Sequence, residues 1–242
     1  MNKNKLKNLI IIFIVGGFGG LLLSNVIFPK LAGFAVFSDV NWMKGDQTVI
    51  VNKTEEINIQ EAEILGEVIK KNKESLVVIK TFRNGAFLSS GTGFVVSSDG
   101  LILTRREVVS GSQNKITIDR GEDTFDAEIL KRLDDHGLLL LKSDASNLPV
   151  VSFADTSAIS LGNKVFLIGK KQGALGSIDF INVGIIKSVD DLLLETNIKE
   201  DINLSSGTPL LNLKGDVLGI NFANSNGYVF SVSSSIIQDF IY

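Results

Sequence analysis

Short apolar runs separated by turn residues fill the sequence from residue 76 to residue 232. They are rich in Val, Ile, Leu and Phe, and turn pairs such as Asn84-Gly85 and Asn226-Gly227 punctuate them. The predicted strands are residues 76–81, 93–97, 101–104, 115–119, 125–130, 138–142, 164–168, 178–186, 192–195, 209–213, 217–221 and 228–232. Because no helical pattern interrupts them, they predict an all-β sandwich or barrel rather than a parallel α/β sheet.

The amino-terminal segment has a different character. Residues 9–28 carry no charged side chain, and as a helix rising about 1.5 Å per residue they would span about 30 Å, the thickness of a bilayer's hydrocarbon core. Lys3, Lys5 and Lys7 precede this run and no acid occurs before Asp39, which places the amino terminus in the cytoplasm. A cleaved signal peptide is the alternative, but its apolar region is usually only about 7–15 residues long and ends in small residues. The sequence therefore predicts a single-pass cell-membrane anchor with an extracytoplasmic domain.

Two short amphipathic helices flank the predicted strands. Residues 59–73 place Ile64, Leu65 and Val68 at helical spacing, and residues 233–242 form a second helix of this kind at the carboxyl end. The predicted organisation is a cytoplasmic amino terminus at 1–8, an anchor at 9–28, a juxtamembrane spacer at 29–58 and a folded domain at 59–242.

Composition excludes several classes of function. Residues 31–242 hold 20 basic and 27 acidic residues, a net charge of −7, which argues against nucleic acid as a partner. The chain has no cysteine, so a disulfide scaffold, a thiol nucleophile and a thiolate zinc site are excluded. We find no cofactor signal, and Asp134-Asp135-His136 is too local a cluster to indicate a metal site.

A serine in front of a glycine, at residues 202–210 (INLSSGTPL), is the main candidate for chemistry. A tight, glycine-bearing turn between strands is one way to present a serine nucleophile to a cleft. The same residues also form ordinary polar turns, so this stretch alone does not decide between the two interpretations.

Four segments in order resemble HtrA/DegP-type trypsin-like serine proteases. They are residues 91–104 (GTGFVVSSDGLILT), 161–169 (LGNKVFLIG), 183–186 (VGII) and 208–221 (TPLLNLKGDVLGIN). The resemblance runs from about residue 60 to the end of the sequence. It implies two packed six-stranded antiparallel β-barrels, at about 75–145 and 150–235, with a cleft for a polypeptide between them. Such relatives carry a PDZ domain, which we do not expect in this sequence. Oligomerisation is common among them, so the resemblance also implies a possible homo-oligomer.

The resemblance also assigns the positions of the catalytic groups. Such proteases need a serine nucleophile, a histidine base and an aspartate that orients the histidine. Ser206 stands at the serine position, but Glu107 stands at the histidine position and Gly137 at the aspartate position. Leu204 replaces the glycine whose N–H would form the oxyanion hole together with that of Ser206, and a Cβ there is costly if the turn needs a positive φ. Loss of the serine or of the histidine alone costs about 10⁶ in turnover, so the sequence predicts a trypsin-like fold without trypsin-like catalysis.

The single histidine, His136, is the only substitute base in the sequence. It adjoins the missing aspartate, so in the family's geometry it would point away from Ser206 or fall short of hydrogen-bond reach unless Glu107 oriented it. Our hypothesis is a membrane-anchored pseudoprotease that binds a peptide or protein, or regulates an active relative. The alternatives are an active serine endopeptidase that uses Ser206 with His136, and a purely structural domain whose cleft is filled.

Overall fold

The computed structural model describes residues 3–23, 27, 53–109, 111, 115–155, 159–174, 176–190 and 192–242. The chain divides into two compact units, Met1–Thr54 and Glu55–Tyr242. In the first unit, helix α1 (Lys3–Leu22) covers much of the predicted anchor. No helix among the described residues is long and apolar enough to cross a membrane. The end of the predicted anchor and most of the predicted spacer, residues 24–26 and 28–52, lie outside the described residues.

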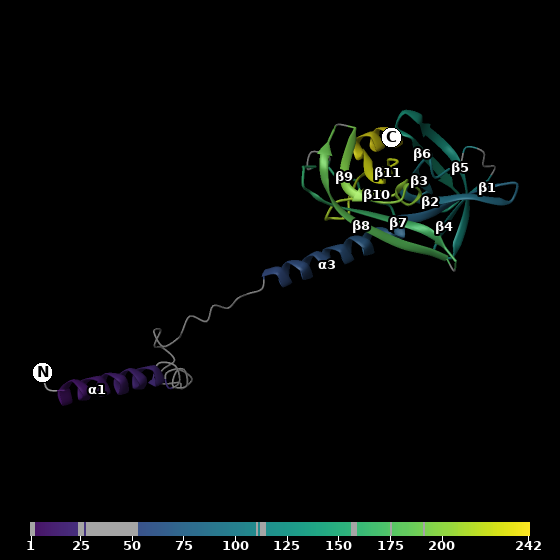
Figure 1. Ribbon diagram of the computed structural model, residues 1–242. Coiled ribbons are helices and arrows are strands. Elements are labelled where there is room, and N and C mark those ends of the chain that lie inside the picture. The colour runs from purple at the N-terminus through teal and green to yellow at the C-terminus, as the bar shows by residue number, and fades with distance from the viewer. Residues whose placement is uncertain are drawn as a thin grey trace. The chain divides into compact units, whose positions relative to one another are not determined.

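Twelve described strands form two closed antiparallel barrels, which confirms the predicted all-β, trypsin-like architecture (Figure 1). The first barrel has the order β1-β2-β3-β6-β5-β4, with β1 Leu76–Arg83, β2 Ala86–Ser97, β3 Leu101–Arg105, β4 Lys115–Arg120, β5 Asp123–Leu133 and β6 Leu138–Ser143. The second has the order β10-β11-β12-β9-β8-β7, with β7 Lys164–Gly173, β8 Gly176–Val189, β9 Leu193–Lys199, β10 Pro209–Leu211, β11 Val217–Ala223 and β12 Tyr228–Ser233.

Strand β6 shows why its sequence is a continuous run of leucines. Successive side chains of a strand point to opposite faces of the sheet. Leu139 and Leu141 therefore enter the interior of the first barrel, whereas Leu138 and Leu140 enter a second core that is shared by both barrels. A strand that is buried on both faces reads as an apolar run instead of an alternating pattern.

Strand β10 is shorter than predicted because Asn212 starts a turn. Its Oδ1 accepts hydrogen bonds from the backbone N–H groups of Lys214 (2.8 Å) and Asp216 (2.9 Å). An Asn side chain that bonds the backbone two residues further along competes with strand pairing. The residues 212–213 that were predicted as strand therefore belong to the β10–β11 connection.

Helix α3 (Lys53–Asn72) begins at Lys53 rather than at residue 59, and the 3₁₀ turn η4 (Lys73–Ser75) leads from it into β1. Its last turn docks on the β10–β11 turn of the second barrel. The Lys71 ammonium lies 2.8 Å from Asp216 Oδ1, and Asn72 Nδ2 donates to the carbonyl oxygen of Gly215 at 3.0 Å. The carboxyl-terminal helix α5 (Ser234–Ile241) buries Ile237 and Phe240 in the core shared by the barrels.

Thr92 on β2 joins the two barrels directly. Its Oγ1 donates to the carbonyl oxygen of Lys170 on β7 (2.9 Å) and accepts from the Lys170 N–H (3.0 Å). This paired contact fixes the first barrel against the second close to the loop that carries Ser206.

Candidate functional site

Glu107 and Ser206 line the same cavity, of about 280 Å³, between the two barrels. The first barrel supplies residues 87–90 of β2 together with Glu107 and Val108 from the turn after β3. The other side comes from Asn203 in the short helix α4 (Ile202–Ser205) and from Ser206, which follows that helix. The fold thus brings the predicted histidine-position and serine-position residues to one place.

Arg105, the last residue of β3, controls the position of Glu107. Its Nε donates to Glu107 Oε2 at 3.0 Å and its Nη2 donates to Oε1 at 3.2 Å, a bidentate ion pair. Nη1 donates to the carbonyl oxygen of His136 at 2.8 Å, and the guanidinium carbon lies 4.4 Å from the ring centroid of Phe222 on β11. The Arg105 side chain is only 7% exposed, so its charge is balanced mainly by Glu107.

Gly137 stands at the predicted aspartate position. The guanidinium of Arg105 lies in the space that a side chain at residue 137 would enter. A Cβ built on Gly137 would lie 2.7 Å from Arg105 Nη2 and 3.6 Å from Glu107 Oε1. Gly137 also has φ +64°, a conformation that favours glycine. The Arg105–Glu107 pair therefore occupies the space beside Gly137, the residue that the resemblance assigns to the aspartate position.

The two N–H groups that the resemblance assigns to the oxyanion hole are both used inside the protein. The Leu204 N–H donates to the carbonyl oxygen of Asp201 (3.1 Å), and the Ser206 N–H donates to that of Ile202 (3.1 Å). Asp201 caps helix α4, since its side chain accepts the Asn203 N–H at 2.8 Å. An oxyanion hole needs donors that are free and aimed at the developing charge, so this helical turn withdraws both.

Leu204 carries no positive φ, contrary to the strain expected for it. Among the described residues, the only non-glycine positions with positive φ are Asn84 and Asn147. The Leu204 side chain is accommodated because its backbone belongs to helix α4.

Ser206 is itself buried, with a relative exposure of 2%. Its Oγ has no hydrogen-bond partner among the described residues. A serine becomes a nucleophile when an adjacent base lies within about 2.6–3.2 Å of its hydroxyl. The structure brings Glu107 and Ser206 to one cavity but records no hydrogen bond between them.

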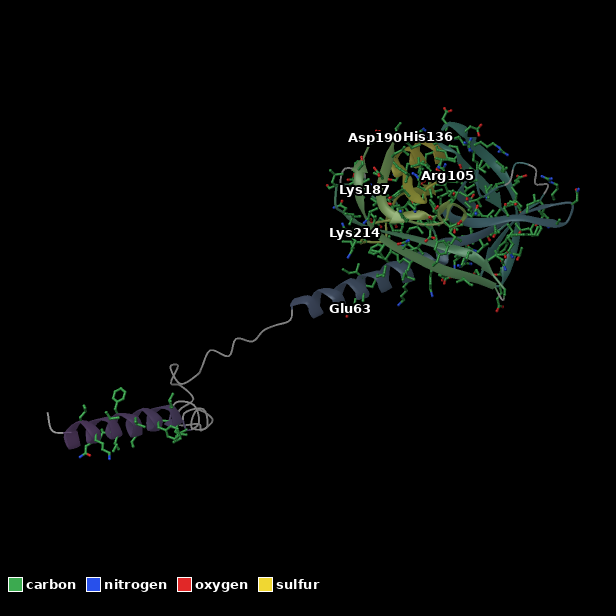
Figure 2. The ribbon with its side chains drawn as sticks, viewed as in Figure 1. Glu63, Arg105, His136, Lys187, Asp190 and Lys214 are labelled. Carbon is green, nitrogen blue, oxygen red and sulfur yellow. The ribbon has the colours of Figure 1, made fainter. Side chains whose placement is uncertain are left out.

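His136 lies in the 3₁₀ turn η5 (Asp134–His136), at the edge of the first barrel and near Arg105 (Figure 2). The backbone of His136 contacts the Arg–Glu pair, through its carbonyl oxygen. The imidazole is not among the side chains that line the Ser206 cavity, and Glu107 bonds Arg105 where the swapped arrangement would need it to bond His136.

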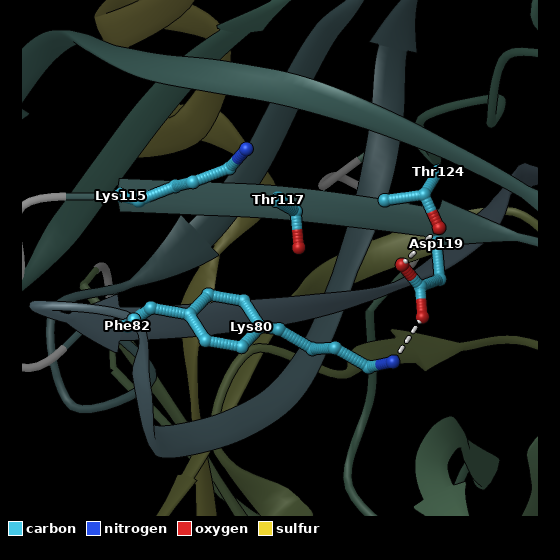
Figure 3. A pocket seen from close by; sticks show the side chains of 7 residues that line it. Lys80, Phe82, Lys115, Thr117, Asp119 and Thr124 are labelled. Carbon is cyan, nitrogen blue, oxygen red and sulfur yellow. Dashed lines mark hydrogen bonds and ion pairs between the residues drawn. The ribbon is translucent and has the colours of Figure 1, made fainter.

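Another cavity, of about 350 Å³, lies on the first barrel and contains none of the predicted site residues. Figure 3 shows Lys80 and Asp119 pointing toward one another there, and they form an ion pair. Asp119 Oδ1 also accepts from Thr124 Oγ1 at 2.9 Å, and Lys115 pairs with Asp126. Because this cavity holds none of the residues that the resemblance assigns to catalysis, the candidate functional site remains the cavity at Ser206.

The sequence reasoning missed Arg105 and Phe222. A signal was present, because Arg105 continues the phase of Leu103, which faces the core shared by the barrels. A charged residue in the inward phase of a strand is rarely buried without a partner. The neighbouring Glu107 could have been recognised as that partner.

A family model described as "Trypsin-like peptidase domain" matches residues 91–220, more than half of the chain. The chain belongs to this family. Within it the chain is an HtrA-like serine protease homologue, and the match covers Glu107, Gly137 and Ser206.

Known relatives extend well beyond the matched region. A "Probable periplasmic serine endoprotease DegP-like" of Halomonas elongata is 31% identical over 62% of this chain and 34% of its own length. "Serine protease HTRA1B" of Danio rerio is 30% identical over 73% of this chain and 40% of its own length. The chain thus spans about a third to two fifths of these curated relatives. The crystal structure of the serine endoprotease from Yersinia pestis has the same fold, with a TM-score of 0.64 at 23% identity over 73% of this chain and 64% of that one.

Proposed function

We propose that this trypsin-like peptidase homologue is catalytically inactive and acts as an extracytoplasmic polypeptide-binding or regulatory module. The observation that carries the proposal is the Arg105–Glu107 pair. The Arg105 guanidinium lies beside Gly137, at the predicted aspartate position. It donates one hydrogen bond to each carboxylate oxygen of Glu107. No base is then bonded to Ser206 Oγ, and a lost base alone reduces turnover by about 10⁶ in such triads.

The proposed partner is a polypeptide in the cavity between the barrels. Residues from both barrels line this cavity, and peptides commonly bind such sites in extended form through main-chain hydrogen bonds. Relatives named as endoproteases support a polypeptide as the class of partner. An active endopeptidase that uses Ser206 with a rearranged base is the second candidate, and the buried, unpaired hydroxyl of Ser206 disfavours it.

We expect no covalent labelling of Ser206 when the full-length protein is treated with a fluorophosphonate probe. The probe needs an activated serine and a route to its hydroxyl, and Ser206 Oγ is buried with no hydrogen-bonded base. Intact mass spectrometry would measure the adduct. Trypsin treated in parallel shows that the probe is active, and Ser206→Ala serves as the matched control. Labelling that disappears in Ser206→Ala would contradict the proposal, and His136→Ala would then test the substitute base.

We further propose that residues 9–28 anchor the protein in the cell membrane, with the peptidase homologue outside the cytoplasm. The support is the uncharged run and the lysines before it. We expect the full-length protein to remain in the membrane pellet after extraction with alkaline carbonate. A variant with Ile12→Lys and Val15→Lys should enter the supernatant, because each charge at mid-bilayer costs about 2.5–3.5 kcal/mol. A mature amino terminus beyond residue 28, found by mass spectrometry, would instead indicate a cleaved signal peptide.

A further inference from the structure

Glu107 is one of the residues that line the Ser206 cavity. Arg105 takes one hydrogen bond at each of the two carboxylate oxygens. An ionised carboxylate offers about four lone-pair sites, so each oxygen can accept one further hydrogen bond. The Glu107 side chain is 37% exposed, whereas that of Arg105 is 7% exposed. Of the two side chains in the ion pair, Glu107 is therefore the one that a ligand can reach.

The remaining charged neighbour of Glu107 is weakly attached. Arg106 Nε lies 3.7 Å from Glu107 Oε1, and the Arg106 side chain is 58% exposed. Exposed ion pairs of this kind contribute little, so a ligand can displace Arg106 into solvent. Glu107 is also the only charged side chain among the described residues that line the cavity. The cavity thus offers an acceptor to a cationic donor.

Strand β2 contributes two apolar side chains, Phe87 and Leu88, and two hydroxyl side chains, Ser89 and Ser90, to the cavity wall. Phe87 is 54% exposed and packs edge-on against Phe82, with ring centroids 6.1 Å apart. Leu88 follows it along the wall. A cavity lined by an exposed aromatic ring and by a single carboxylate suits a group that has a positive charge and an adjoining apolar side chain.

We infer that this cavity binds the primary ammonium group of a peptide, with Glu107 accepting its hydrogen bonds and the adjoining side chain lying against Phe87. The inference rests on the proposed function, since it specifies which peptide group the module recognises. The amino terminus of a peptide and a lysine side chain carry the same ammonium. The pKa of the first is about 7.7–8.0 and that of the second about 10.4, which allows an experiment to separate them.

The test measures binding of three peptides to the full-length protein by fluorescence anisotropy. The first is Ala-Val-Ser-Val-Gly-Ser with a carboxyl-terminal fluorophore and a free amino terminus, and the second is its acetylated form. The third is acetylated and has lysine in place of alanine. At pH 6.5 we expect the first peptide to bind about tenfold more tightly than the second, the gain typical of a charge-assisted hydrogen bond. The preference should disappear as the pH rises through about 8, where the amine loses its proton.

Two variants locate the effect. Glu107→Gln keeps the shape and one acceptor for Arg105, and we expect it to abolish the preference for the free amine. Arg106→Gln removes the competing cation and should preserve or increase the preference. The comparison of free and acetylated peptides needs no variant, so it remains decisive even if Glu107→Gln folds poorly.

Each outcome distinguishes the site from the proposed function. A preference for the lysine peptide alone, kept at pH 9, supports the ammonium site and assigns lysine as its source. Equal binding of the free and acetylated peptides overturns the ammonium site and leaves a peptide-binding cleft. No binding of any of the three peptides overturns the ammonium site and counts against the peptide-binding proposal as well.

Discussion

Glu107→Ala is expected to lower the free energy of unfolding by about 3 kcal/mol, the lower end of the range for leaving a buried charge without its partner. Arg105 would keep its hydrogen bond to the His136 carbonyl oxygen and its contact with Phe222. Its charge would lose the carboxylate of Glu107, the one carboxylate bonded to it within the part of the chain that the structure describes. The lower end applies because Glu107 is 37% exposed and water can enter the space it leaves. Urea denaturation of the full-length protein measures the change.

Arg106→Ala is the matched control for that experiment. Arg106 is the sequence neighbour of Arg105 and contacts the same carboxylate, but at 3.7 Å and with 58% of its side chain exposed. We expect it to change stability by less than about 1 kcal/mol. Equal effects of Glu107→Ala and Arg106→Ala would show that the ion pair between Arg105 and Glu107 does not hold the site together.

Gly207→Ala is expected to destabilise the protein by about 3 kcal/mol or more. This figure adds the cost of a side chain on a left-handed backbone to the cost of overpacking. Gly207 has φ +84°, and a Cβ built on it would lie 2.2 Å from the Thr92 carbonyl oxygen and 2.7 Å from Thr104 Oγ1. The Thr92 carbonyl oxygen cannot move freely, because it accepts a hydrogen bond from the Thr104 hydroxyl. The Thr92 side chain is also hydrogen-bonded to the backbone of Lys170. Urea denaturation would measure the loss.

Gly85→Ala isolates the steric part of that cost. Gly85 has nearly the same backbone conformation, φ +82°, but nothing lies within 4 Å of its added Cβ. We expect a loss of only about 1 kcal/mol, the cost of the left-handed backbone. If Gly207→Ala cost no more than Gly85→Ala, the close approach of the Ser206 loop to the first barrel would be disproved.

The positions of the strands could be read from the sequence because they follow from local pattern. Strands such as β1, β3 and β6 are marked by apolar runs that end at turn residues, and the turn at Asn84-Gly85 connects β1 to β2 as expected. The ends of the strands were less predictable. Strands β7 and β8 pair as far as Gly173 and Gly176, beyond the predicted residues 168 and 178, since their hairpin continues past the barrel's apolar positions.

The candidate site could be located only through its motifs. Glu107 and Ser206 are far apart in the sequence, and no periodicity indicates that they line one cavity. The resemblance placed them in one site, and the barrels bring them together there. The sequence contained no comparable motif for Phe222, whose role depends on β11 passing beneath Arg105.

The sequence by itself determined the strand succession and the family, and through the resemblance it assigned Glu107 and Gly137 to the histidine and aspartate positions. Only the tertiary structure decided which groups these two residues meet. Arg105 fills the space beside Gly137 because the two barrels bury its guanidinium against Phe222, where a single carboxylate must balance it. Likewise, the N–H groups of Leu204 and Ser206 are withdrawn because their loop closes into a helical turn. Both outcomes depend on which polar groups satisfy one another once water is excluded, and this is a property of packing rather than of local sequence.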